Sequence, residues 1–262
     1  GGGHLDADTI LSPASASVAR LAAGSGLDAI TRLERGEADA AFLAVRPPGH
    51  HATATRAMGF CVFNNAAVAA AALAAAGERV LVVDVDAHHG NGTQDIFYER
   101  GDVAYVSWHQ HPLYPGTGRL EDVGSGEGEG TTLNLPMPPD ATGEHYRRSI
   151  EEIIAPFSER FGTTWLVISA GFDSHRRDPL TDLGLTSGDF SDITTDLVQL
   201  VEPGRRLVFL EGGYDLQAVA DSGAATVASL LGERVHPEPP TSGGPGSVVV
   251  NQVAELRRRF DR

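Results

Sequence analysis

The sequence predicts an α/β fold in three layers, a mostly parallel sheet with helices on both of its faces. Short apolar runs rich in valine, leucine and isoleucine alternate along the chain with longer helix-forming segments. That alternation is typical of a parallel sheet whose connections are helices. The runs are uninterrupted, as strands covered on both faces require. With 262 residues, of which 41% are hydrophobic, the chain can bury the core of one large domain.

The first part of the chain predicts helices followed by a short strand. Residues 1–9 (GGGHLDADT) form a flexible lead-in. Pro13 lies near the start of a helix expected over 11–23, because proline is favoured in the first turn of a helix. A second short helix is expected over 27–35. The apolar run at 41–45 (AFLAV) then predicts a buried strand.

The middle of the chain continues the alternation. An alanine-rich helix over 65–76 is strongly favoured by intrinsic propensity. A strand over 80–86, a short helix over 94–100 and a strand over 103–108 follow it. Residues 109–130 form a long loop rich in turn-forming residues. Loops of that length inside a compact domain are usually functional or mobile.

The same pattern completes the predicted sheet. Further strands are expected at 132–135, 165–170 and 207–210, each a short apolar run, and helices at 143–161, 187–201 and 216–231. The second of these helices would be capped by Ser187 with Asp189 in its first turn, where a carboxylate is favoured by the helix dipole.

The C-terminal residues differ in composition from the rest. Residues 237–246 (PEPPTSGGPG) are typical of a linker. A terminal helix is expected over 248–262, with arginines 257–259 forming a solvated end. We therefore expect one domain over 1–232 and a Pro/Gly linker with a C-terminal tail over 233–262.

Charge and composition exclude several classes of function. A formal net charge of −15 argues against a nucleic-acid binder, since phosphate contacts need clustered basic residues, and it favours a cationic ligand. No apolar run reaches the roughly 18 residues of a membrane span. The single cysteine, Cys61, excludes an internal disulfide and a cysteine-rich zinc site, and it fits a reducing compartment. We expect a soluble, cytoplasmic protein that does not contact membranes.

The stretch at 80–93, VLVVDVDAHHGNGT, joins a buried strand to a dense group of polar side chains. While the strand lasts, Asp84, Asp86 and His88 lie on one face. A single aspartate after a strand is usually a helix cap, and a single histidine is usually a satisfied polar residue. Two aspartates and two histidines within six positions favour a metal site instead.

Other predicted strands also end in polar clusters. The strand at 41–45 leads through two prolines to His50 and His51, and later strands lead to Asp173 and Tyr214. In a parallel sheet these clusters meet along one edge, where sites of α/β proteins form.

Asp86, His88 and Asp173 would then supply two carboxylates and one imidazole. These three ligands leave a position open for water or substrate, as a catalytic zinc requires. The same donors accommodate Fe(II) or Mn(II).

Nucleophilic chemistry has less support. The sequence has no G-x-S-x-G elbow and no G-x-x-x-x-G-K-[ST] loop. Cys61 near a helix start, with His50 upstream, permits a Cys-His nucleophile. A buried cysteine acting as a small hydrophobic residue is the more common case.

Several motifs together resemble the histone deacetylase superfamily, which includes acetylpolyamine amidohydrolases and acetoin-utilisation-type proteins. They occur in family order, are most similar to the class II and bacterial branches, and read RPPGHH at 46–51, GFCVFNN at 59–65, DVDAHHGNGTQ at 84–94, SAGFDSHRRDPL at 169–180 and EGGYD at 211–215. The resemblance implies the arginase/deacetylase fold. It also implies that an N-terminal segment, with the first strand and a substrate-rim loop, is missing here.

The resemblance assigns roles to individual residues. It implies metal ligands at Asp86, His88 and Asp173; catalytic residues at His50, His51 and Tyr214, with Asp84 and Asn91 as partners of the two histidines; and substrate contacts at Phe60, Gly59, His111, Gly213 and Asp8, with Asp6 as the alternative rim carboxylate. A structural K⁺ site would be formed around Asp84, Asp86, His88 and Ser107.

The implied activity is zinc-dependent hydrolysis of an N-acetyl amide, with Fe²⁺ as the alternative metal. The expected partner is an acetyl-lysine peptide or protein, or a small acetylated amine such as an acetylpolyamine. His51 would act as the base, His50 electrostatically, and Tyr214 on the oxyanion. Two alternatives stay open: a two-metal ureohydrolase similar to arginase, and a non-catalytic protein that binds small amines or a partner.

Overall fold

The computed structural model of the protein describes residues 2–260. Gly1, the first residue of the predicted lead-in, and residues 261–262, the end of the predicted terminal helix, lie outside the described residues. Within 2–260, the main sheet has six strands, all parallel, in the order β3-β8-β7-β4-β5-β6. The strands are β3 (Ala41–Leu43), β4 (Val80–Asp84), β5 (Val103–Gln110), β6 (Thr132–Met137), β7 (Trp165–Ala170) and β8 (Arg206–Leu210).

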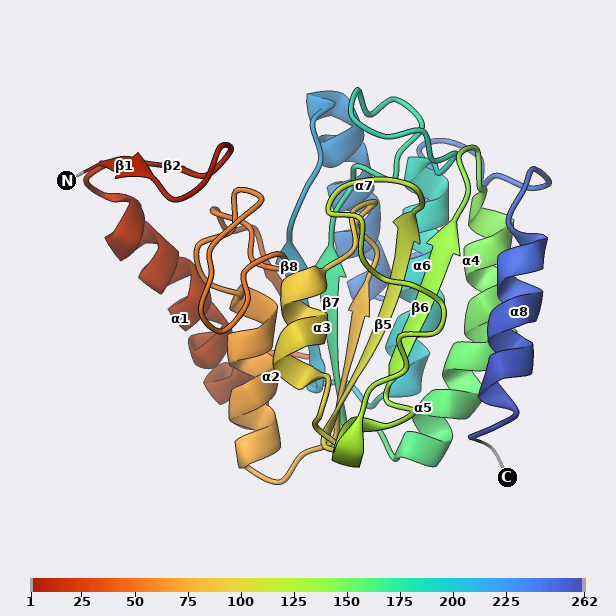
Figure 1. The fold of residues 1–262 in the computed structure, drawn as a ribbon, viewed down its shortest axis with the longest axis horizontal. Helices are drawn as coiled ribbons and strands as arrows, with labels where there is room; N and C mark the ends of the chain where they lie inside the picture. Colours follow the sequence, from red (N-terminus) through yellow and green to blue (C-terminus); the bar gives the residue numbers. More distant parts are fainter. Residues whose placement is uncertain (1, 261–262) are drawn as a thin grey trace.

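Helices cover both faces of this sheet (Figure 1). On one face lie α1 (Ser15–Glu34), α2 (Asn65–Ala75) and α3 (Asn91–Phe97), and on the other α4 (Gly143–Ser149), α5 (Ala155–Phe161), α6 (Ser187–Leu197), α7 (Leu216–Leu230) and α8 (Ser247–Arg257). Alternate strand residues face the two layers: Val82 packs toward α1 and α2, and Val83 toward α5 and α6. This confirms the predicted three-layer α/β fold.

The predicted break between two N-terminal helices is wrong. Helix α1 runs continuously from Ser15 to Glu34 through Gly24 and Gly26. Gly26 lies against the sheet: a Cβ atom there would come within 2.7 Å of the Phe209 ring and 3.3 Å of Ala69. The glycine therefore permits close packing of the helix, which outweighs its low helix propensity.

Several boundaries differ from the sequence prediction. Strand β4 ends at Asp84, so Asp86 and His88 lie in the loop after it, and α3 begins earlier than expected, at Asn91. The helix predicted over 143–161 contains a π-helical turn, Ile150–Ile154, between α4 and α5. Helix α6 is capped by Thr186 rather than Ser187, in a capping box with Asp189. It ends in a 3₁₀ turn, Val198–Leu200.

The segment expected to be a linker and tail packs against the domain. Val250 and Val253 of α8 are buried in the hydrophobic core on the face of the sheet that α4, α5 and α6 also cover. The Arg257 guanidinium donates to the Gly130 carbonyl. Residues 234–241 lie along α6 through side-chain hydrogen bonds. Proline and glycine here form an irregular segment that is fixed by polar contacts, which composition alone does not reveal.

The N-terminal residues form a small antiparallel pair, β1 (Gly3–His4) with β2 (Ile10–Leu11), at the left of Figure 1. The turn between them is ordered by Asp6, whose carboxylate accepts the amides of Asp8 and Thr9 at 3.0 and 2.6 Å. The sequence predicts a flexible lead-in, but the Asp6 carboxylate supplies the acceptor that orders its turn. Among the described helices, none combines the length and the apolar character needed to cross a membrane.

The strand order decides where the functional side chains meet. Strands β3, β8, β7 and β4 are neighbours in the sheet and point the same way. The loops after them therefore leave one edge of the sheet side by side. Those are the loops that carry the polar clusters noted in the sequence.

Candidate active site

The loops after β3, β4, β7 and β8 surround a cavity of about 230 Å³. Its lining combines acidic, imidazole and aromatic side chains: Asp8, Pro48, His50, His51, Gly59, Phe60, Asp86, His88, Tyr114, Asp173, Leu180, Gly212 and Tyr214. The predicted metal ligands and both tandem histidines are thus brought together from distant parts of the chain.

Asp86, His88 and Asp173 form a compact group at the base of this cavity. One potential ligand atom from each lies within 4.8 Å of the others. His88 Nδ1 is 3.1 Å from Asp86 Oδ1 and 2.9 Å from Asp173 Oδ2. The second oxygen of each carboxylate is held by the backbone: Gly212 N–H donates to Asp86 Oδ2 at 2.9 Å, and Ala87 N–H to Asp173 Oδ1 at 2.8 Å.

These residues fit a divalent transition metal. Burial and the negative charge of Asp86 raise the pKa of Asp173 to about 7. Burial lowers the pKa of His88, but its hydrogen bonds with Asp173 and Asp86 outweigh this and raise it to about 11. In the forms that bind a metal, two ionised carboxylates and one neutral imidazole, these buried residues carry a net negative charge that a divalent cation would compensate. Hard oxygens with one imidazole nitrogen are donors that Zn²⁺ and Fe²⁺ accept.

His50 is held by carboxylates. Its Nδ1 donates to Asp84 Oδ2 at 3.0 Å, and Asp84 also accepts the Tyr105 hydroxyl at 3.1 Å. Burial lowers the pKa of His50, but Asp86 and Asp84 outweigh this and raise it to about 10. His50 is therefore a charged imidazolium at neutral pH.

His51 has a different partner. Its Nδ1 donates to Asn91 Oδ1 at 2.9 Å, which leaves Nε2 with a lone pair. Burial and the neighbouring charge of His50 lower the pKa of His51 to about 3. A neutral imidazole that lines the cavity can accept a proton, so His51 suits the role of general base.

Tyr214 reaches the cavity from the loop after β8. Its side chain is 36% exposed, and its backbone N–H donates to Asp178 Oδ2 at 2.7 Å. Burial and the charge of Asp86 raise the pKa of Tyr214 above its usual value, so its hydroxyl stays a donor. Gly213 shapes the turn instead of lining the cavity: its φ is +132°, and a Cβ there would lie 2.6 Å from the Val219 side chain.

Phe60, Gly59 and Asp8 also line the cavity. Phe60 has a left-handed backbone, with φ +67°, and its ring centroid is 6.3 Å from that of Tyr214. A Cβ on Gly59 would come within 2.5 Å of His51 Cδ2, so only glycine fits at this position.

The structure does not bring His111 to this cavity. His111 lines a separate groove beside α8, and Tyr114 occupies the wall instead, with its ring edge-on to His51 at 5.2 Å between centroids. The loop leaves β5 after Gln110 and turns back through cis prolines at 112 and 115. In the sequence, the feature that could have identified Tyr114 as a cavity residue is an aromatic side chain followed by Pro-Gly.

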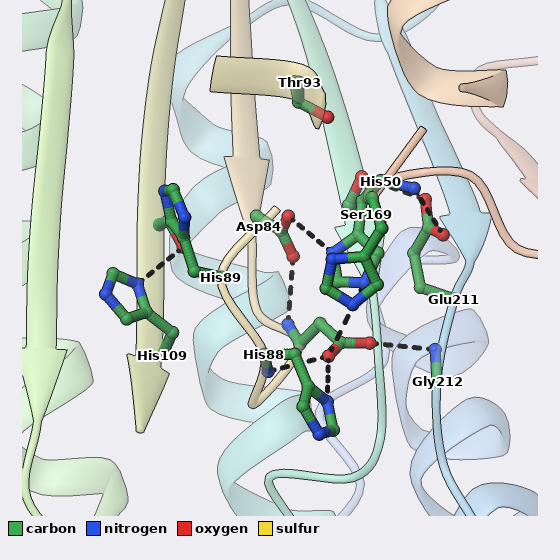
Figure 2. Close-up of polar contacts among 12 residues, drawn as sticks. His50, Asp84, His88, His89, Thr93, His109, Ser169, Glu211 and Gly212 are labelled. Atoms are coloured by element: carbon green, nitrogen blue, oxygen red, sulfur yellow. Dashed lines mark hydrogen bonds and ion pairs between the residues drawn. The ribbon is translucent and has the colours of Figure 1, made fainter. Parts of the chain in front are cut away.

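Sequence reasoning also missed Glu211, at the end of β8. Its side chain is 2% exposed, and Oε2 accepts the backbone amides of Gly49 and His50 at 2.6 and 3.2 Å. Its other oxygen accepts the Ser169 hydroxyl at 3.2 Å. Figure 2 shows the His50 side chain directed at Asp84 and its backbone N–H directed at Glu211. In the sequence, the feature that could have identified Glu211 as a site residue is its position directly after a buried strand.

A second pair of imidazoles lies outside the cavity lining (Figure 2): His89 is in the loop after β4, and His109 is in β5. The rings of His89 and His109 are 4.7 Å apart, and they bond the long loop through Thr117 and Gly118 at 2.7 and 2.9 Å. The hydroxyl of Ser107, a residue of the predicted K⁺ site, donates to His109 Nδ1 at 2.9 Å.

Cys61 is fully buried, and burial with the negative charge of Glu211 raises its pKa. A thiol in that environment is a poor nucleophile. The geometry therefore disfavours the Cys-His alternative.

Comparison with known proteins gives consistent matches. Residues 2–230 match the family model described as the histone deacetylase domain. The chain is 42% identical to Histone deacetylase 15 of Arabidopsis thaliana over 97% of this chain and 47% of that protein. It is 42% identical to a histone deacetylase-like amidohydrolase of Pseudomonas aeruginosa over 89% of this chain and 63% of that protein.

Among solved structures, the crystal structure of the HDA15 HD domain matches with a TM-score of 0.91 and 40% identity, over 99% of this chain and 72% of that chain. The chain spans about half the length of the plant relatives that it matches.

Proposed function

This chain belongs to the histone deacetylase family, and we propose that it is a metal-dependent deacetylase that hydrolyses N-acetyl amides of primary amines to acetate and the free amine. The observation that carries the proposal is the cavity itself. A group of two carboxylates and one imidazole lies at its base, beside a neutral His51 and a protonated Tyr214.

Asp86, His88 and Asp173 would hold the metal, which we propose to be Zn²⁺, with Fe²⁺ suiting the same donors. When bound there, the ion would polarise the acetyl carbonyl and lower the pKa of water from about 15.7 toward about 7. The backbone amides of Gly212 and Ala87 would keep the two carboxylates oriented toward it.

His51 would take the proton from the attacking water through Nε2. Asn91 fixes the tautomer that makes this nitrogen available, and Gly59 leaves room beside the ring. The same proton would then pass to the nitrogen of the leaving amine. His50 would stay protonated between Asp84 and the cavity, where its charge favours negative charge on the reacting acyl group.

Tyr214 would donate a hydrogen bond to the oxygen of the tetrahedral oxyanion. Its raised pKa keeps the proton on the phenol, and the Asp178 contact fixes its backbone. Donors of this kind contribute about 10²–10³-fold in rate.

The mouth of the cavity suits an extended aliphatic amine. Phe60, Tyr114 and Leu180 would contact the methylene chain, and Asp8 would supply a carboxylate beside it. An acetyl-lysine side chain and an acetylpolyamine both meet these requirements, and the net charge of −15 favours either cationic class. A cytoplasmic location and a structural K⁺ site stay predictions.

Acetate release from a panel of substrates tests this proposal. The Zn²⁺-loaded protein would be assayed on N-acetylputrescine, N-acetylspermidine and acetyl-lysine peptides, with Asp173→Asn as the control. We expect turnover that is lost in the control, and the preferred substrate identifies the substrate class. A folded, Zn²⁺-bound protein that releases acetate from none of them would contradict the proposal.

A further inference from the structure

Residues 236–241, here called the strap, lie between the C-terminal end of the family match and α8. The family model ends at residue 230, so the strap lies beyond it. The strap lies along α6: His236 donates to Asp192 at 2.9 Å, and Thr241 Oγ1 donates to Asp189 at 2.7 Å. Both aspartates are buried, so the strap is fixed at both of its ends.

Between these ends, Glu238 contacts the loop that follows β7. Its Oε2 accepts from His175 Nε2 at 2.7 Å, and its Oε1 accepts from the Arg176 guanidinium at 2.8 Å. His175 is 0% exposed. Burial raises the pKa of Glu238, but the hydrogen bonds with His175 and Arg176 outweigh it and lower the pKa to about 2. Glu238 is therefore a fixed, charged acceptor.

His175 connects Glu238 with residues of the active site. It lies two residues after Asp173, its Nδ1 accepts the Arg177 amide at 3.2 Å, and its carbonyl accepts the Asp178 amide at 2.8 Å. Asp178 in turn accepts the backbone N–H of Tyr214 at 2.7 Å. Three hydrogen bonds, joined through the covalent structure of His175 and Asp178, therefore connect Glu238 to the loop of Asp173 and to Tyr214.

This loop has little regular structure of its own to hold it. Between β7 and α6 it forms one isolated bridge, from His175 to Leu185, within the described residues. Catalytic groups must be held within about 0.5 Å of their working positions, and that requires packing and hydrogen bonds from outside the loop. The strap supplies such a contact at His175.

We propose that Glu238 is a positioning residue of the active site, which acts through His175 to hold Asp173 and Tyr214 in place. The inference rests on the proposed deacetylase function, and it extends the functional unit to the strap. Contacts from outside the ligand set that orient metal ligands typically change metal affinity by about 10–100-fold when removed.

Glu238→Gln tests this with little change of shape, and Thr241→Ala is the matched control. Thr241 fastens the same strap to Asp189 and, among the contacts of the described residues, touches α4 and α6 but not the loop at 173–178. The full chain would be measured for Zn²⁺ affinity by competition with a chelating dye, for kcat and KM on the best acetylated substrate, and for Tm.

We expect Glu238→Gln to weaken Zn²⁺ binding by about 10-fold and to lower kcat by a similar factor with KM nearly unchanged. Thr241→Ala should lower Tm and leave both quantities unchanged. In a His175→Ala background, Glu238→Gln should have no further effect on Zn²⁺ affinity.

A purely structural role would give the opposite pattern. Glu238→Gln would then lower Tm as Thr241→Ala does, with wild-type Zn²⁺ affinity and kcat, and the inference would be overturned. If the wild-type protein releases no acetate, the proposed function fails, and Zn²⁺ affinity alone still decides the role of Glu238.

Discussion

The rings of His50 and His51 lie 4.0 Å apart, yet one faces a carboxylate and the other an amide: His50 donates to Asp84, and His51 donates to Asn91. The pair is therefore divided into a charged and a neutral imidazole, with pKa values raised to about 10 and lowered to about 3. That division is what a site needs to combine an electrostatic group with a general base.

Asn91→Asp tests the division. A carboxylate beside His51 favours its charged form, so its pKa should rise, and the neutral base should be lost at higher pH than in the wild type. We expect the acid limb of the kcat/KM profile to move to higher pH, with a loss of about 10-fold near pH 5 and little change near pH 8. An unmoved acid limb would show that His51 is not the titrating base.

Tyr214→Phe removes one hydroxyl from the cavity. We expect kcat to fall by about 10²-fold or more, because the oxyanion loses a donor, while KM and Zn²⁺ affinity stay near wild type. Tyr114→Phe is the matched control, since it removes a hydroxyl from another tyrosine of the cavity lining and keeps its ring, so kcat should change little. Equal effects of the two substitutions would remove Tyr214 from the mechanism.

Glu211→Ala should affect both stability and rate. The amides of Gly49 and His50 would lose their acceptor in a buried place, at a cost of about 1–3 kcal/mol in the free energy of unfolding. Because these amides belong to the backbone that positions His50 and His51, kcat should fall as well. Ser169→Ala removes only the other contact of Glu211 and should be milder in both measurements. If Ser169→Ala is as damaging, Glu211 does not act through this loop.

Zn²⁺ binding should release protons. In the metal-free protein the pKa of His88 is raised to about 11 and that of Asp173 to about 7. At pH 7 His88 therefore holds a proton and Asp173 is about half protonated, and a bound cation displaces these protons. Affinity should therefore weaken as the pH falls from about 11, where His88 begins to hold its proton, and more steeply below about 7, where Asp173 does so too. Calorimetry at pH 7 in buffers of different ionisation enthalpy should show release of about one proton or more per ion. Binding that is independent of both buffer and pH would contradict the protonation states described above.

Much of the site could be predicted because its residues follow buried strands. The apolar runs that became β4 and β7 are unambiguous, so the positions of Asp86 and Asp173 at one sheet edge follow from parallel pairing alone. Tyr114 could not be placed in this way, since it lies in a loop without periodicity and the contacts of His89 and His109 with that loop set its path.

The helix break expected between residues 23 and 27 is wrong because tertiary packing outweighs helix propensity there: Gly26 lies against Phe209. Around Glu238, the hydrogen bond with His175 fixes a proline-rich segment that has no regular structure. Local composition shows where a chain can break or turn. It does not show which side chain from elsewhere fills the space or accepts the hydrogen bond.

We propose that one metal ion held by Asp86, His88 and Asp173 supports amide hydrolysis in this cavity. The most direct test is to titrate metal-free protein with Zn²⁺ while acetate release from the best acetylated substrate is measured. We predict activity that rises to a plateau at one Zn²⁺ per chain and is absent in Asp173→Asn at the same loading. A requirement for two ions, with urea released from a guanidino substrate and no acetate, would contradict the deacetylase and favour the ureohydrolase.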